Sequence, residues 1–153
     1  MKPNTKKKVN GWLPDKDYDF IYSHSPRLCI DLVIKDRRGV LFALRDIEPH
    51  KDRWHLPGGR VRWREPILDA IRRIAKQELN ILVEVIKMLG HVEYLRECQN
   101  GSLRHTVSIV FLVKVAGGIP ENCWQSKKIA FFKVLPKKIQ REQGKFLAEN
   151  NLL

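Results

Sequence analysis

The sequence predicts one α+β domain in which helices pack around a sheet. Several segments carry apolar residues at every second position, as strands do, whereas residues 66–79 carry them at helical spacing. The chain has 153 residues, a length that suits one core, and 43% of them are hydrophobic, too many for a disordered chain. No repeat or low-complexity stretch divides residues 1–153, so we expect a single domain, with residues 1–11 as a flexible basic N-terminus.

The first elements are expected to be strands. Apolar side chains at every second position predict a strand at residues 28–34. Residues 36–39 have the composition of a turn, and the apolar run at residues 40–45 returns as the second strand of a hairpin. Short extended pieces at residues 54–56 and 60–61 flank a Pro-Gly-Gly turn.

The helix predicted at residues 66–79 carries a carboxylate on its apolar face. Pro66 stands at its start, where the missing N–H would have no partner anyway. At about 100° per residue, Ile71 and Ile74 lie in one apolar stripe and Glu78 lies in its middle. Burying an unpaired carboxylate costs several kcal/mol. Glu78 therefore needs an arginine, a proton or a metal ion beside it, unless the helix ends early and leaves it in solvent.

Long strands are expected in the second half of the chain. Residues 81–98 are rich in strand-forming residues, with an interruption near Gly90, and residues 105–115 alternate between apolar and other side chains. A last strand is expected at residues 129–134 and a closing helix at residues 137–150. This mixture of elements completes an α+β domain around a sheet.

The composition excludes several classes of protein. The longest uncharged apolar-rich stretch, at about residues 106–113, is far shorter than the ~20 residues that cross a bilayer. No apolar segment follows the basic start of the chain, so we expect no secretory signal. The three cysteines have no metal-finger spacing, and their odd number favours a reducing, cytoplasmic environment.

The charge balance indicates a class of partner. Lys and Arg number 29 and Asp and Glu 17, which leaves a net charge of +12. Such a charge raises the local concentration of nucleotides, polyphosphates or nucleic acid. A solvated surface without a binding role explains the same charge equally well.

A glycine pair precedes the predicted helix. Gly58 and Gly59 allow the backbone to approach a ligand, metal ion or phosphate closely, and Arg60 offers a planar fork suited to phosphate oxygens. A Gly-Gly pair by itself is most often a turn. Its combination with Glu65 and Glu78 at fixed spacing indicates a binding site.

These residues resemble the Nudix box, in which a glycine is followed at set intervals by Glu, an Arg-Glu pair, a Glu-Glu pair and a glycine. Residues 54–61 match the usual lead-in to this box. The box positions are occupied, in order, by Gly59, Glu65, Arg73, Ile74, Ala75, Gln77, Glu78, Asn80 and Ile81. Ile74 and Gln77 thus stand where the box has carboxylates, and Asn80 replaces its last glycine.

The departures resemble one Nudix subfamily, the GDP-mannose mannosyl hydrolases, which lose the same two carboxylates and keep the acid that Glu78 matches. The resemblance extends over about residues 12–136, and it includes an opening helix near residues 13–20. It implies a Nudix fold with a mixed β-sheet between α-helices, and a homodimer. It also implies divalent-metal-dependent hydrolysis of a nucleotide sugar, GDP-mannose-like.

The resemblance also implies roles for individual residues. One Mg²⁺, or Mn²⁺ in its place, would be held by Glu78, the Gly58 carbonyl and Gln125, together with pyrophosphate oxygens and water. Arg60 and the metal would stabilise the departing nucleoside diphosphate while water attacks the anomeric carbon of the sugar. Arg45 matches a residue associated there with catalysis and substrate binding.

Asp31 also matches a residue associated with catalysis in this subfamily. The simpler interpretations are an edge aspartate for Asp31 and a strand-end arginine for Arg45.

The general base of the subfamily has no matching residue in this sequence. The subfamily's Gln-His pair corresponds to Gln125 and Ser126, and a serine hydroxyl does not take a proton unaided at neutral pH. His50 and His55 flank the box and lie in reach of a substrate, without support from the pattern.

Three functions are compatible with the sequence. The first is a hydrolase that releases free sugar and nucleoside diphosphate by substitution at carbon. The second is a Nudix pyrophosphohydrolase that cleaves at phosphorus of another nucleoside diphosphate derivative. The third is a catalytically impaired domain that binds a nucleotide or RNA, although the sequence contains no recognisable RNA-binding module.

Overall fold

The computed structural model describes residues 13–153 except residues 49, 100 and 124, so the basic segment expected at residues 1–11 lies outside the described residues. The described elements are α1 (Asp15–His24), β1 (Arg27–Asp36), β2 (Gly39–Arg45), β3 (Trp54–His55), β4 (Gly58–Arg60), α2 (Ile67–Leu79), β5 (Leu82–Gln99), β6 (Ser102–Gly117), β7 (Ser126–Phe132) and α3 (Arg141–Glu149).

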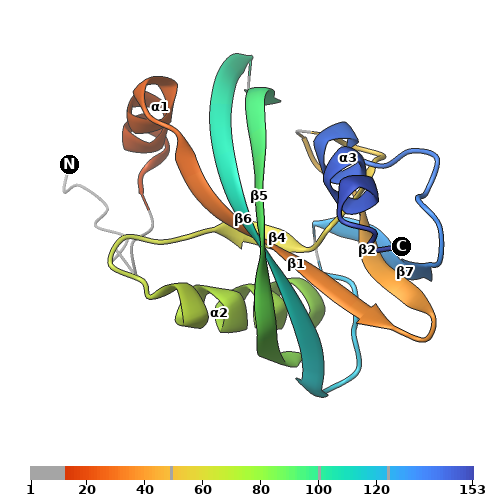
Figure 1. Ribbon diagram of the computed structural model, residues 1–153. Helices are drawn as coiled ribbons and strands as arrows, with labels where there is room; N and C mark the ends of the chain where they lie inside the picture. The colour runs from red at the N-terminus through yellow and green to blue at the C-terminus, as the bar shows by residue number, and fades with distance from the viewer. Residues whose placement is uncertain (1–12, 49, 100, 124) are drawn as a thin grey trace.

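The strands form one mixed sheet with helices on both sides (Figure 1). Its order is β3-β2-β1-β6-β5, with β4 beside β1 and β7 beside β2. Strands β1 and β6 run parallel, with Leu28 opposite Val107, and β1 and β2 form the predicted antiparallel hairpin. The predicted α+β class, with a mixed sheet between helices, is confirmed.

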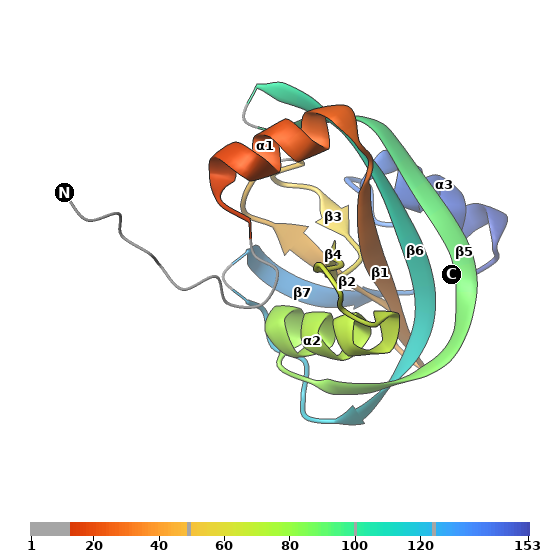
Figure 2. The ribbon, with the colours of Figure 1, turned by 90° about the vertical axis from the view of Figure 1, so that its left-hand side faces the viewer.

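Helix α1 lies across one end of the sheet, at the opposite end of the view from α2 (Figure 2).

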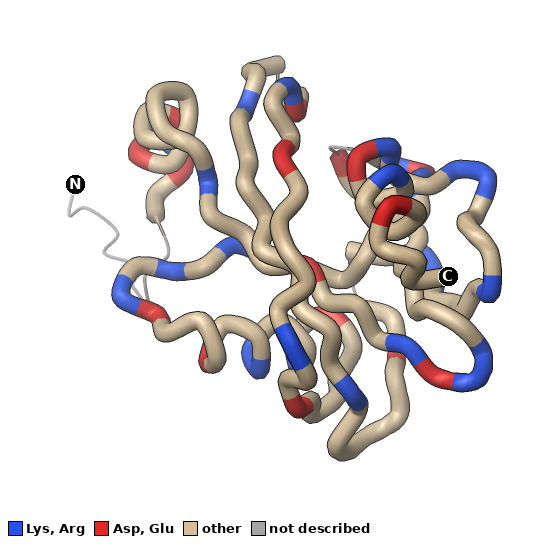
Figure 3. The backbone as a smooth tube through the Cα atoms, in the orientation of Figure 1, with Lys and Arg blue, Asp and Glu red and all other residues tan. Residues whose placement is uncertain are grey.

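Figure 3 shows that Lys and Arg are spread along the backbone from the β1–β2 turn to α3, interleaved with Asp and Glu. Within the described residues, every helix is too short or too polar to cross a bilayer.

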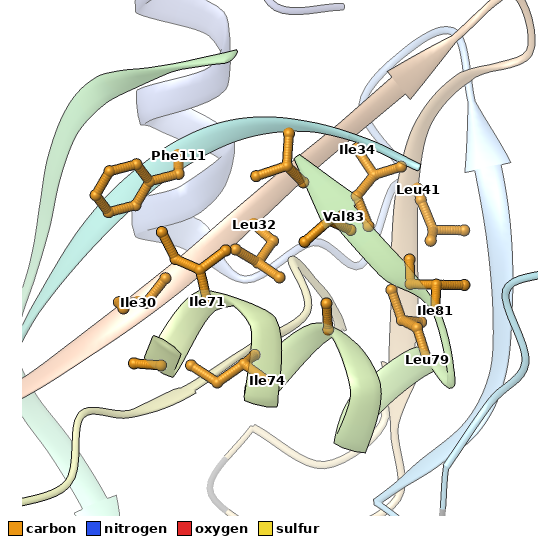
Figure 4. Packing of buried hydrophobic residues seen from close by; sticks show 13 residues of the cluster. Ile30, Leu32, Ile34, Leu41, Ile71, Ile74, Leu79, Ile81, Val83 and Phe111 are labelled. Atoms are coloured by element: carbon orange, nitrogen blue, oxygen red, sulfur yellow. The ribbon is translucent and has the colours of Figure 1, made fainter. Parts of the chain in front are cut away.

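One face of the sheet packs against α2 (Figure 4). Ile71 and Ile74 of the helix are at most 1% exposed and belong to the same cluster as Ile30, Leu32 and other sheet residues. The helical stripe and the period-two face that the sequence predicts therefore pack against each other. Burying a side chain of this size contributes roughly 1.5–3 kcal/mol, so this contact fixes α2 on the sheet.

The opposite face packs against α3. Val33 points to this side, as expected for the residue between Leu32 and Ile34, and clusters with Val110 and with Leu147 of α3. The first turn of α3 is capped by the Gln140 side chain, which accepts a hydrogen bond from the Gln143 N–H.

Some boundaries differ from the prediction. The closing helix begins at Arg141, because residues 136–139 form a turn and Gln140 is its N-cap. The last strand begins at Ser126, three residues earlier than predicted, since its polar start pairs with Arg45 of β2. Neither the start of α3 nor the start of β7 is marked by a periodic pattern of hydrophobic residues in the sequence.

Helix α2 ends at Asn80 in the left-handed conformation, with φ 55° and ψ 32°. The Asn80 N–H donates to the Lys76 carbonyl, and the Ile81 N–H donates to the Ala75 carbonyl. Asparagine is among the few residues other than glycine that tolerate this conformation. The replacement of the last glycine of the box by Asn80 therefore leaves the helix end intact.

We predict that Asn80→Gly is more stable than Asn80→Ala by about 1 kcal/mol, because glycine adopts φ 55° without strain and alanine does not. Both variants lose the same side-chain contacts, so the difference between their free energies of unfolding reports the backbone strain at this position. Urea denaturation measures the two free energies of unfolding. An alanine variant as stable as the glycine variant would contradict this account of the helix end.

Candidate active site

A cavity of about 590 Å³ lies between α1, α2 and the sheet, and we call it the site cavity. It is lined by residues from α1, β1, β2, β4, α2, β5, β6 and the loop before β7. The residues to which sequence analysis gives a metal-binding, catalytic or substrate-binding role all line it: Asp31, Arg45, Gly58, Arg60, Glu78 and Gln125. Glu65 and Ser126 do not line it.

Gly58 lies in strand β4, opposite Asp31 of β1. A Cβ atom at this position would lie 2.4 Å from Asp31 Oδ1 and 2.6 Å from the Ile30 carbonyl oxygen. The glycine pair predicted as a turn is therefore strand backbone, and Gly58 is required by the closeness of β1 rather than by a turn conformation.

The Gly58 carbonyl points away from β1. In the antiparallel pairing of β1 with β4, Leu32 N–H donates to the Pro57 carbonyl and Val61 N–H donates to the Leu28 carbonyl. Gly58 and Asp31 form a non-hydrogen-bonded pair between these bonded positions. In such a pair, neither the N–H nor the C=O of either residue bonds to the other strand. Its carbonyl oxygen is therefore not used by β1.

Asp31 is 7% exposed, and its carboxylate is held by two other elements. The Tyr94 hydroxyl of β5 donates to Oδ2 at 2.9 Å, and Gln143 Nε2 of α3 donates to the same oxygen at 3.3 Å. Burial raises the pKa of Asp31 to about 6, against the effect of these hydrogen bonds. Asp31 thus links β1, β5 and α3 beneath Gly58.

Glu78 lies in the last turn of α2, half-buried at the wall of the site cavity. The Cys123 thiol donates to Glu78 Oε2 at 3.4 Å. Burial raises the pKa of Glu78, and the charges of Arg45 and Arg73 act against that rise. The carboxylate that breaks the apolar stripe in the sequence therefore faces the cavity.

Two further box residues hold the loop before α2. Arg73 binds Glu65 through Nε at 2.6 Å and through Nη2 at 2.8 Å, and Nη2 also donates to the Arg60 carbonyl. The Arg62 N–H donates to the same Glu65 carboxylate. This bidentate pair joins the loop to the helix and keeps β4 and α2 in a fixed relation.

Among the described residues, five arginines line the site cavity, and Arg60 and Arg45 are the two predicted for the site. Arg60 Nη1 donates to the Tyr22 hydroxyl at 3.0 Å, and its guanidinium lies 5.4 Å from the centre of the Tyr18 ring. Arg45 Nε donates to the Ile47 carbonyl. Burial lowers the pKa of Arg45, whereas the nearby carboxylates oppose that effect.

Sequence analysis missed a polar cluster at the other end of the site cavity, formed by Arg27, Glu97, Thr106 and His50. Arg27 and Thr106 both bond to Glu97 Oε2, and His50 Nε2 lies 3.4 Å from Glu97 Oε1. Thr106 and Ser108 stand at the positions between the apolar residues of this strand, and the residues that Thr106 meets depend on the register of β1, β5 and β6.

The subfamily's base position is turned away from the cavity. Ser126 is 7% exposed, and its hydroxyl donates to the Cys123 carbonyl at 3.4 Å. Gln125 lines the site cavity, and its carbonyl accepts a hydrogen bond from the Asp46 N–H.

The residues at the cavity wall fit a hard cation. Among the residues that the structure describes, no three His, Cys, Asp or Glu side chains are grouped to hold a metal ion. The donors available are instead oxygens of the Glu78 carboxylate, the Gly58 carbonyl and the Gln125 amide. Mg²⁺ prefers oxygen ligands and often binds through few protein carboxylates, with water and substrate phosphates completing its shell.

Comparison with known proteins identifies relatives. The model of the NUDIX domain matches residues 25–149. The chain is 36% identical over 93 residues to the low-salt glycan biosynthesis protein Agl8 of Haloferax volcanii, a match that covers 61% of this chain and 56% of that protein. It is 31% identical over 119 residues to an ADP-ribose pyrophosphatase of Methanocaldococcus jannaschii, covering 76% of this chain and 68% of that protein. The chain thus spans little more than half the length of Agl8.

Solved structures have the same fold. The MutT NUDIX hydrolase from Burkholderia pseudomallei superposes with a TM-score of 0.73 at 27% identity, over 82% of this chain and 98% of that one. The MutT protein from Methanosarcina mazei superposes with a TM-score of 0.71 at 17% identity, over 84% of this chain and 95% of that one.

We predict that Asp31→Asn removes a pH dependence of stability. Because the folded state raises the pKa of Asp31 from 3.8 to about 6, it binds this proton more tightly than the unfolded chain does. The stabilisation from the protonated acid is complete below pH 3.8 and is lost as the pH rises through about 6.

At pH 7 the Asn variant should therefore be more stable than the wild type by about 2–3 kcal/mol, and the difference should vanish near pH 3. Urea denaturation in EDTA across this range measures it. A difference that stays constant with pH would show that Asp31 is not the group responsible.

Proposed function

This chain is a member of the NUDIX family, and from that membership we propose that it hydrolyses a nucleoside diphosphate sugar of the GDP-mannose type. The products are free sugar and nucleoside diphosphate, formed by substitution at the anomeric carbon with Mg²⁺ or Mn²⁺ present. We also propose that residues 1–153 act as one domain; the homodimer stays a prediction.

The observation that supports this proposal is that the box places a single carboxylate, that of Glu78, at the site cavity. Ile74 fills one acid position and is 1% exposed, packed among core residues. Gln77 fills the other and accepts a hydrogen bond from Arg73. Glu78 alone remains, which favours one cation over the pair of metals that clamps an in-line displacement at phosphorus.

The arginines at the cavity suit a diphosphate leaving group. Arg60, bonded to Tyr22, and Arg45, bonded to the Ile47 carbonyl, offer guanidinium donors whose orientation is set before a substrate arrives. When bound at Glu78, the divalent cation would neutralise negative charge on the departing diphosphate. Asp31 joins β1 to β5 and α3 beneath Gly58 through its contacts with Tyr94 and Gln143.

The relatives support a nucleotide derivative as substrate. Agl8 is named for glycan biosynthesis, which agrees with a sugar-bearing substrate. The net charge of +12 also favours an anionic ligand. The interleaved distribution of basic and acidic residues along the backbone gives less support to a nucleic-acid-binding function (Figure 3).

A second candidate function is cleavage at phosphorus of another nucleoside diphosphate derivative. The observation that favours it is the 31% identity to a protein named ADP-ribose pyrophosphatase. The two reactions differ in the atom that water attacks, so isotope labelling separates them.

We predict that hydrolysis in H₂¹⁸O with Mg²⁺ places ¹⁸O in the released sugar and leaves the nucleoside diphosphate unlabelled. Mass spectrometry of both products measures the label for GDP-mannose and for ADP-ribose as comparison. Label confined to a phosphate would establish the second candidate. Binding of nucleotide without turnover of any nucleotide sugar would show that the domain is a binder.

We predict that Glu78→Gln weakens Mg²⁺ or Mn²⁺ binding at least tenfold and lowers kcat by a similar or larger factor, because it removes the only carboxylate among the proposed ligands. Calorimetry without substrate measures the affinity. Because burial raises the pKa of Glu78, the wild-type affinity should fall as the pH is lowered. Glu121→Gln is the matched control, since Glu121 is exposed and contacts Asn80. Unchanged metal affinity in Glu78→Gln would remove Glu78 from the site.

A further inference from the structure

We propose that His50, oriented by Glu97, is the general base that takes a proton from the attacking water. This role rests on the proposed hydrolysis at carbon. It supplies the base that the subfamily pattern does not, since Ser126 occupies the position of the subfamily's histidine and its hydroxyl donates to a backbone carbonyl.

Only two of the five histidines line the site cavity, His50 and His55. His24 lies exposed on α1. The side chain of His91 is 63% exposed and contacts Glu93 at 3.5 Å. His105 lies on β6 but does not line the cavity.

His55 is unsuited to the role. Its Nδ1 lies 2.7 Å from the Leu56 carbonyl, so this nitrogen carries the hydrogen and donates it. Burial lowers the pKa of His55 to about 4. An imidazole with so low a pKa takes a proton weakly at neutral pH.

His50 meets a carboxylate through one ring nitrogen. Its Nε2 lies 3.4 Å from Glu97 Oε1, a loose contact of the kind that is common in ligand-free sites. With the hydrogen on Nε2 facing Glu97, the lone pair lies on Nδ1. A base whose second nitrogen is oriented by a carboxylate is the arrangement that activates a nucleophile in hydrolytic triads.

Glu97 is held in the ionised form. Although burial acts to raise the pKa of Glu97, the contact with His50, the hydrogen bond from Thr106 and the charge of Arg27 keep that pKa below its usual value. The carboxylate can therefore accept from His50 and stabilise the imidazolium that forms when the proton is taken.

The backbone of His50 is also unusual. Its φ is 67°, in the left-handed region that residues other than glycine rarely adopt. This conformation belongs to the loop between β2 and β3, which brings the histidine to the Glu97 end of the site cavity. Backbone strain of this kind gathers at functional sites.

Two other carboxylates, those of Glu121 and Asp31, are less suited to the role. Glu121 is exposed, contacts Asn80 and does not line the site cavity. Asp31 is 7% exposed beneath Gly58, with one carboxylate oxygen bonded to Tyr94 and Gln143.

The hydrolysis consumes one water molecule and releases one proton. His50 Nδ1 takes one proton from water, and the water oxygen forms a bond to the anomeric carbon. The bond between that carbon and the bridging oxygen of the diphosphate breaks, and its electron pair stays on that oxygen. The imidazolium then releases its proton to solvent, so the products are sugar, nucleoside diphosphate and one proton.

The test compares His50→Asn with His91→Asn, because asparagine tolerates the left-handed backbone of His50. We expect His50→Asn to lower kcat for sugar release by 10²–10⁴-fold. The affinity for GDP with Mg²⁺, measured by calorimetry, should stay within about twofold, and His91→Asn should keep both values. In His50→Gly, added imidazole should restore part of the rate.

Glu97 acts as a positioning residue, so Glu97→Gln should lower kcat with little change in KM. Full turnover by His50→Asn, or a loss that imidazole does not restore in His50→Gly, would overturn the role of His50 and leave the proposed function standing. A wild-type protein that releases no sugar from any nucleotide sugar would overturn the proposed function, and this role with it.

Discussion

The close pairing of β4 with β1 is the constraint on which the site depends. Gly58 lies so near Asp31 and the Ile30 carbonyl that any side chain at this position would collide with them. The register of this pairing directs the Gly58 carbonyl away from β1 and places Arg60 at the site cavity. Asp31 in turn is bonded from β5 and α3, so three distant parts of the chain meet under one backbone position.

Opposite charges alternate along the site cavity, in the order Glu78, Arg45, Glu97 and Arg27. Burial favours the neutral form of each group, and a neighbour of opposite charge opposes that effect; burial prevails for Glu78 and Arg45, whereas the pKa of Glu97 is lowered. Charges held in this way are oriented before a substrate enters, which is the condition for stabilising charge as it develops in a reaction. The same alternation leaves His50 next to an ionised carboxylate.

Local patterns predicted most of the fold. The α2 stripe, the β1–β2 hairpin and the alternation of β6 follow from side-chain period alone, because each buries one face against the core. The start of β7 was not predictable in this way. Its first residues are polar and exposed or paired only through the backbone, so their strand conformation comes from pairing with β2.

The sequence by itself determined that one acid, Glu78, breaks the apolar face of α2, and that Ile74 and Gln77 replace two others. These features depend on spacing within one helix, where neighbours in space are three or four residues apart. Only the tertiary structure decided that Gly58 covers Asp31 and that Glu97 gathers Arg27, Thr106 and His50. Arg27 and Glu97 are 70 residues apart, and their contact depends on the register of strands β1, β6 and β5, which no local pattern contains.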